Sequence, residues 1–95
     1  MPMFVGIFQV ELLLPQSQSL KDKRLVLNSV KSRIGNQFNV SIAEVDQNEL
    51  WQRATLGMSL VANERKFVDQ VFNKILNLLD GEHQLEVIQH QLEVV

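Results

Sequence analysis

The sequence predicts an α+β fold with the element order β-α-β-β-α-β, and three observations lead to this prediction. First, residues 3–14 form a long apolar run rich in β-branched and aromatic side chains, which is typical of a strand. Second, apolar residues recur at helical spacing in two separate stretches, 20–35 and 64–80. Third, apolar and polar residues alternate over much of 38–62 and again over 84–95, as they do in half-buried strands.

The first strand, over residues 3–14, has apolar side chains at both odd and even positions, so we expect a central strand covered at least partly on both sides. Gly6 lies inside this strand and Gly57 lies inside the third predicted strand. A glycine inside a strand indicates a bulge or the close approach of a large side chain that covers the strand. We expect that role here, because the glycines are scattered singly and form no phosphate-binding loop.

The first helix is expected over residues 20–35. Ser19 is placed to cap its N-terminus, and Asp22, three residues later, completes an approximate capping box. Gly35 or Asn36 can adopt the left-handed conformation that closes a helix.

Residues 38–46 and 54–62 predict the two strands of a hairpin joined by a polar loop. Within the first of these strands, Glu44 and Asp46 fall on one face by simple alternation. Two carboxylates at that spacing could bind Mg²⁺ or act as acid and base, or they could pair with Arg53 or a base of the first helix at the surface.

The second helix is expected to begin after Asn63, to carry a wide apolar stripe and to end at Asp80-Gly81. Residues 84–95 complete the chain as a strand. Its alternation places Leu85 and Val87 on one face and Ile88, Leu92 and Val94 on the other.

This order of elements is that of the ferredoxin-like fold. Its four strands form one antiparallel sheet in the order 4-1-3-2, both helices cover one face, and the other face is left open. No repeat, linker or low-complexity segment interrupts the chain, so residues 1–95 are expected to form a single domain.

The composition excludes several classes of protein. The chain has 95 residues and no cysteine, which excludes a disulfide scaffold, an iron–sulfur cluster and a thiol nucleophile. Nine basic against eleven acidic residues give a net charge of −2, which excludes a uniformly basic nucleic-acid binder. No apolar run approaches the roughly 20 residues of a membrane span, and the first residues lack the charged region of a secretory signal, so we expect a cytoplasmic protein with no membrane partner.

The positive charge is concentrated in one segment. Residues 21–33 hold five bases against one acid, a balance of +4, whereas the other four bases and ten acids balance at −6. The predicted fold brings the start of the first helix to the same end as the hairpin loop and the connection Gly81–His83. A helix N-terminus with basic side chains attracts phosphate, and a nearby tryptophan can stack on a base. The candidate nucleic-acid-binding residues are Lys21, Lys23, Arg24, Trp51 and Arg53.

The sequence contains no Ser/His/Asp or carboxylate–histidine grouping and no local metal motif that includes histidine. His83 and His90 lie seven residues apart on opposite faces of the predicted strand, so they do not converge on a metal. We therefore expect no cofactor and no enzymatic activity. The open sheet face offers a second function, assembly into a homodimer or larger oligomer through the sheet or its edges, with Val5 and Ile7 exposed on that face.

Three blocks of the sequence resemble the YlxP-like family of small bacterial proteins, a domain of unknown function. The blocks are SLKDKR at 19–24, FNVSIAEVD at 38–46 and LWQRATLG at 50–57. The resemblance extends over essentially the whole chain and implies a ferredoxin-like fold. Some members are encoded beside transcription-elongation, translation-initiation and ribosome-binding factors, which implies a role in RNA or ribosome biology. The family provides no established catalytic residues to transfer.

Overall fold

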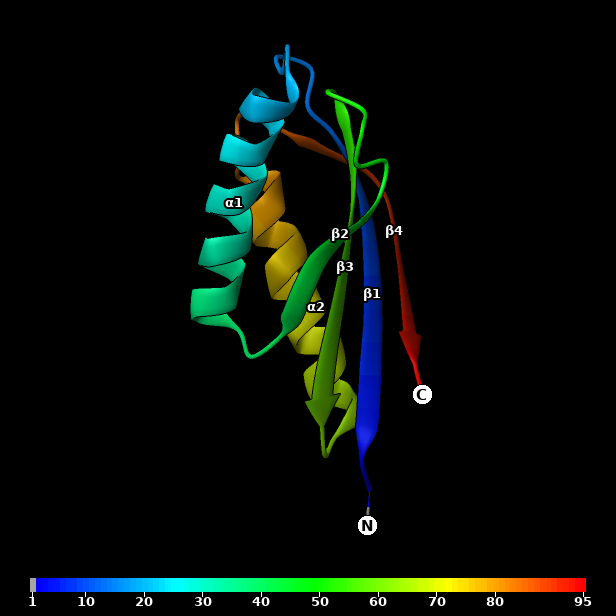
Figure 1. The fold of residues 1–95 in the computed structure, drawn as a ribbon. Helices are drawn as coiled ribbons and strands as arrows, with labels where there is room; N and C mark the ends of the chain where they lie inside the picture. The colour runs from blue at the N-terminus through cyan, green and yellow to red at the C-terminus, as the bar shows by residue number, and fades with distance from the viewer. Residues whose placement is uncertain (1) are drawn as a thin grey trace.

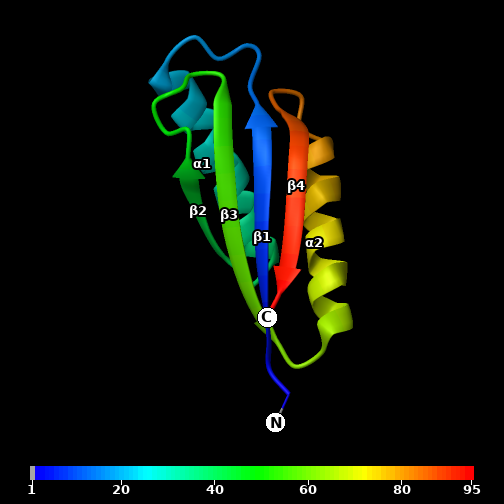
Figure 2. The same cartoon turned by 90° about the vertical axis from the view of Figure 1, so that its right-hand side faces the viewer.

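The computed structural model describes residues 2–95 and contains six elements in the order β-α-β-β-α-β. They are β1 (Phe4–Leu13), α1 (Leu20–Gln37), β2 (Ser41–Asp46), β3 (Arg53–Ala62), α2 (Arg65–Asp80) and β4 (Glu86–Val94). All neighbouring strands are antiparallel, in the order β2-β3-β1-β4. Both helices lie on one face of the sheet, and the other face is open (Figures 1 and 2). The predicted ferredoxin-like fold is confirmed.

The core lies between the sheet and the two helices. Phe8 and Val10 of the central strand β1 point toward the helices and are no more than 1% exposed. Phe8 stacks on Phe72 of α2, with 4.3 Å between the ring centroids. On the open side of β1, Ile7 is 45% exposed, so β1 is central as predicted but well covered on only one side.

The two strand glycines are sites of close approach, as predicted. A Cβ atom on Gly6 would lie 2.5 Å from Cγ1 of Val68 and 2.8 Å from the ring of Phe72, so α2 packs directly on the backbone of β1. A Cβ atom on Gly57 would lie 2.9 Å from Cγ1 of Val45, which covers β3 on the open face. The absence of a side chain at each position lets a neighbouring element sit close to the sheet.

Helix α1 begins as predicted and ends later than predicted. The backbone N–H of Asp22 donates to the Ser19 hydroxyl at 3.0 Å, and the Asp22 carboxylate accepts from the N–H of Gln18 at 3.0 Å. The helix runs through Gly35 to Gln37. The prediction that Gly35 or Asn36 closes the helix is therefore wrong, because the backbone hydrogen bonds continue past both residues.

Several other element ends also differ from the prediction, by one to three residues. Strand β2 begins at Ser41 instead of residue 38, and Glu64 replaces Asn63 as the residue that precedes α2. Glu64 makes no side-chain capping hydrogen bond. Gly81 ends α2 as predicted, although its φ of −81° is right-handed.

A bulge in β2 separates the two carboxylates that alternation places together. Glu44 pairs with Leu56 on the helix side of β3, whereas Asp46 pairs with Thr55 on the open side, because Val45 is an extra residue between them. The prediction that Glu44 and Asp46 share a face is therefore wrong.

A second bulge changes the faces of β4. The pairing of β1 with β4 skips Ile88, so Val87 lies on the helix side together with Leu92 and Val94. The predicted division of these apolar residues between two faces is wrong, because one extra residue inverts the alternation. The open face of β4 instead displays Gln89, Gln91 and Glu93.

Candidate functional site

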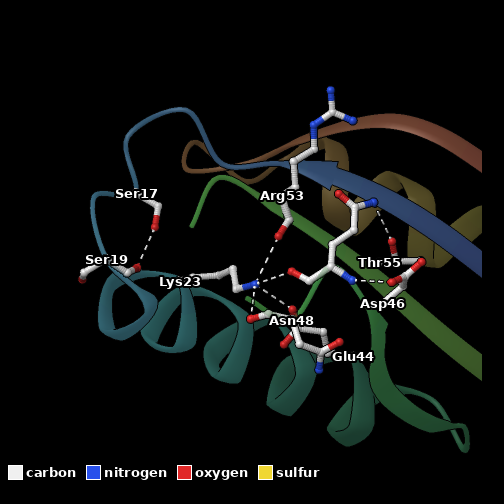
Figure 3. Close-up of polar contacts among 9 residues, drawn as sticks. Ser17, Ser19, Lys23, Glu44, Asp46, Asn48, Arg53 and Thr55 are labelled. Carbon is white, nitrogen blue, oxygen red and sulfur yellow. Dashed lines mark hydrogen bonds and ion pairs between the residues drawn. The ribbon is translucent and has the colours of Figure 1, made fainter. Parts of the chain in front are cut away.

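Lys23, in the first turns of α1, is buried where the helix meets the loop 47–52, and its side chain is 1% exposed. Its ammonium group lies 2.8 Å from a carboxylate oxygen of Glu44. It also donates to the backbone carbonyl oxygens of Gln47 at 3.0 Å, Asn48 at 3.1 Å and Arg53 at 3.2 Å (Figure 3). Four acceptors thus surround a group that has three N–H donors, so every donor is engaged.

This arrangement corrects the predicted surface site. The sequence prediction places Lys23 among the bases available to a nucleic acid, whereas the structure encloses it and uses all its donors. A buried charge is costly unless it is paired and hydrogen-bonded, and here those contacts fasten α1 to β2 and to both ends of the loop 47–52. Lys23 is therefore a structural residue that anchors this loop.

The three sequence blocks of the family resemblance meet at this ammonium group. Lys23 comes from the block 19–24, Glu44 from 38–46, and the carbonyl of Arg53 from 50–57. The sequence contains one signal of this role, because Lys23 precedes the buried Leu27 by four positions and so lies on the apolar stripe of α1.

Further hydrogen bonds hold the loop 47–52 beside the β1–α1 connection. The side-chain amide of Gln52 donates to the carbonyls of Pro15 at 3.3 Å and Ser17 at 3.2 Å. The backbone carbonyl of Gln52 accepts from the N–H of Leu14 at 2.8 Å. The predicted meeting of the first strand, the first helix and the hairpin loop at one end is confirmed (Figure 2).

Gln47 begins the loop in an uncommon conformation. Its φ of 60° is left-handed, which few residues other than glycine adopt. The side-chain amide of Gln47 donates to the Thr55 hydroxyl at 3.0 Å, and its backbone N–H donates to the Asp46 carboxylate at 2.7 Å. These contacts, with the one to Lys23, give the loop a defined shape.

The tip of this loop is apolar and exposed. Leu50 is 51% exposed and Trp51 is 53% exposed. The side chain of Arg53 is also exposed and points away from Lys23 in Figure 3, although its carbonyl accepts from the lysine. The loop therefore presents a tryptophan to solvent from a fixed backbone, and the first residue of β3 presents an arginine beside it.

The remaining predicted bases lie on the exposed faces of α1. At 100° per residue, Lys21 points about 160° away from Lys23 and Arg24 about 100° away. Arg24 is therefore directed closer to the loop than Lys21. Asp22 and Glu49 are also exposed at this end and reduce its positive charge. The five predicted residues are thus brought to one end of the molecule but not onto one surface.

A shallow cavity of about 270 Å³ lies beside this end. It is lined by Leu14, Gln16, Ser17, Asp22, Leu25, Val26 and Gln84. The α2–β4 connection therefore approaches the start of α1, as predicted. The same connection contributes an ion pair between Glu82 and Arg33 of α1.

Across residues 2–95, no group of three His, Cys, Asp or Glu side chains is arranged to hold a metal ion. Within the same residues, neither helix is long and apolar enough to cross a membrane.

Comparison with known proteins identifies the family. A family model described as a protein of unknown function, DUF503, matches residues 5–92, which include the whole Lys23 cluster and the loop 47–52. The chain belongs to the DUF503 family. An uncharacterized protein YlxP of Bacillus subtilis strain 168 is 32% identical over 82 residues, which cover 86% of this chain and 89% of the relative. The YlxP-like resemblance is confirmed.

A solved structure shares the fold of this DUF503 protein. An amidase of the hydantoinase/carbamoylase family from Burkholderia phymatum superimposes with a TM-score of 0.58 at 10% sequence identity. The match covers 99% of this chain but 28% of the amidase, so the chain spans little more than a quarter of that enzyme. At this identity the likeness shows the fold alone.

Proposed function

We propose that this DUF503 protein is a non-enzymatic binding protein that contacts single-stranded RNA, free or within a ribosomal component, through the loop 47–52 and the bases beside it. The observation that carries the proposal is the exposure of Trp51. Its side chain is 53% exposed, and it lies on a loop whose backbone carbonyls accept hydrogen bonds from Lys23. A base stacked on an aromatic side chain contributes about 1–3 kcal/mol. A loop whose backbone is already fixed loses little conformational freedom on binding.

Two exposed bases supply the phosphate contacts in this proposal. Arg53 follows the loop directly, and Arg24 projects from the first turns of α1 on the side nearer the loop. The nearby carboxylates of Asp22 and Glu49 offset part of this positive charge, so few phosphates can be bound. We therefore expect the bound stretch of RNA to be a few nucleotides long. Two phosphate contacts on a single strand give a slope of about −1.4 for the logarithm of affinity against the logarithm of salt concentration.

The placement of the carboxylates supports binding over acid–base chemistry. Glu44 is engaged by Lys23, and Asp46 lies on the opposite face of β2. The two groups that the sequence offers as an acid–base pair are therefore separated by the sheet. This separation favours a surface that recognises a partner without transforming it.

The fluorescence of Trp51 tests the proposal, because it is the only tryptophan in the chain. Titration with octauridylate at low salt should quench this fluorescence, and the affinity should fall as salt is added. The double variant Arg24→Ala/Arg53→Ala should bind more weakly. Arg65→Ala/Lys66→Ala, which removes two exposed bases from the start of α2, is the matched control. No quenching at low salt, or equal weakening by both double variants, contradicts the proposal.

The second candidate function is self-assembly through the open sheet face. Ile7, Val45 and Val61 are 45%, 55% and 62% exposed on that face, around a shallow cavity of about 320 Å³ over Gly57. In this case light scattering should give about 22 kDa, twice the 10.9 kDa of the chain, and Ile7→Lys should lower it to that of a monomer. Asn73→Lys on the helix side is the control. A monomeric wild type at high concentration contradicts assembly.

A further inference from the structure

The two edges of the sheet differ in what they offer to a partner. Strand β2 has six residues and is interrupted by the bulge at Val45. Strand β4 has nine residues, is regular from Gln89 to Val94 after its bulge, and contains no lysine or proline. Lysine, proline and bulges are the devices that protect an edge against pairing. The regular part of β4 lacks them.

The unpaired backbone groups of β4 can be assigned from its bonds to β1. Val5 and Val95 exchange two backbone hydrogen bonds of 2.9 Å each. In an antiparallel ladder such bonded pairs alternate with unbonded ones. Glu93 and Gln91 therefore bond to β1, whereas His90, Leu92 and Val94 direct their N–H and C=O groups toward the free edge.

Helix α2 forms a wall beside this free edge. In Figure 2, which looks onto the open face, α2 extends past β4 at the right-hand side of the sheet. Between the two elements lies a hollow of about 330 Å³, here called the β4–α2 groove. Its lining residues are Phe8, Asp69, Phe72, Asn73, Leu76, His90 and Leu92. The stacked Phe8 and Phe72 form its floor, and Leu92 is 38% exposed at its rim.

We propose that the β4–α2 groove binds an extended segment of a partner protein as a fifth strand beside β4. The free N–H and C=O groups of His90, Leu92 and Val94 would bond to the segment's main chain, and the hollow would take alternate apolar side chains. Residues 64–95 carry six acids against three bases, and Asp69 lies in the groove. The segment that fits therefore combines alternating apolar residues with a lysine or arginine on the same face.

A second copy of this chain is a less suitable occupant of the groove than a single strand. Two-fold pairing of β4 with its own copy keeps both α2 helices on the same face of the joined sheet. Because α2 extends past β4, the two helices would compete for the same space at the symmetry axis (Figure 2). A single strand meets no such obstacle.

The probe for this proposal is the peptide acetyl-Arg-Thr-Val-Thr-Val-Thr-amide, whose arginine and valines share one face. Titrated into ¹⁵N-labelled protein, it should shift the amide signals of His90, Leu92 and Val94 and slow their hydrogen exchange. The amides of Ser41–Asp46 on the other edge should not change. Shifts confined to the β2 edge or the open face, or no shifts at millimolar peptide, overturn the proposal.

Charge reversal supplies the second arm of the test. Asp69→Lys should weaken peptide binding about fivefold or more, because the ion pair with the peptide arginine becomes a repulsion. Asp80→Lys makes the same charge change at the far end of α2 and should bind like the wild type. Equal weakening by the two variants overturns the proposal. The proposal is also overturned if light scattering shows a dimer and the amides of His90, Leu92 and Val94 are protected from hydrogen exchange in the absence of peptide.

Discussion

The side chain of Lys23 determines how the loop 47–52 is built. Its position in the apolar stripe of α1 is visible in the sequence, through the spacing to Leu27 and Val30. Its acceptors are not visible in the sequence, because three of the four are backbone carbonyls. Every residue has a backbone carbonyl, so no pattern of side chains predicts which ones will accept. For this reason the sequence predicts Lys23 at the surface with Lys21 and Arg24, whereas the structure buries Lys23 and leaves the other two exposed.

Removal of the Lys23 ammonium should destabilise the protein strongly. Lys23→Met leaves the Glu44 carboxylate and three carbonyls without their donor, and we expect a loss of about 3–5 kcal/mol in the free energy of unfolding. Urea denaturation measures this loss. Lys21→Met, two positions away and exposed, is the control and should change stability by less than about 0.5 kcal/mol. Similar values for the two variants would show that Lys23 anchors nothing.

The same substitution should loosen the loop in the folded protein. Trp51 of Lys23→Met, measured well below the unfolding transition, should show lower fluorescence anisotropy and stronger acrylamide quenching than the wild type. The reason is that the carbonyls of Gln47, Asn48 and Arg53 lose their common donor. Unchanged anisotropy and quenching in a folded Lys23→Met protein would mean that other contacts shape the loop.

The strands show where alternation succeeds and where it fails. The face assignments of β1 and β3 follow the sequence, because their pairing runs without interruption from Phe4 to Leu13. The face assignments of β2 and β4 are wrong beyond Val45 and Ile88, because a bulge inserts one residue at each of these positions. Neither position has a glycine or proline to signal the bulge, so the sequence assigned Glu44 and Asp46 to one face.

The glycines of α1 and β1 provide a matched test of packing. Gly35→Ala lies in the exposed last turn of α1 with nothing within 4 Å of the added Cβ, so it should stabilise the protein by about 0.4–1 kcal/mol. Gly6→Ala places its Cβ 2.5 Å from Val68 and should destabilise by about 1–3 kcal/mol. Thermal unfolding distinguishes them. A Gly6→Ala variant as stable as the wild type would show that α2 does not need this close approach.

The molecule as a whole carries two separate surfaces on one fold. The order of the elements could be predicted because long apolar patterns at two periods decide it, and local errors of one residue at a bulge do not change that order. The surface charge could be predicted only in part, since the charge count of residues 21–33 includes Lys23, which the structure buries.

The exposed loop 47–52 and the β4–α2 groove lie on different parts of an elongated molecule of 48 × 22 × 20 Å. Asp69→Lys should therefore leave the affinity for octauridylate unchanged.

Photo-cross-linking tests directly whether Trp51 on its anchored loop contacts RNA. The protein is irradiated with octauridylate containing 5-iodouridine, and the adducts are located by peptide mass spectrometry. We expect an adduct on the peptide that contains Trp51 and its loss in Arg24→Ala/Arg53→Ala. Adducts confined to other peptides, or none at low salt, would contradict this expectation.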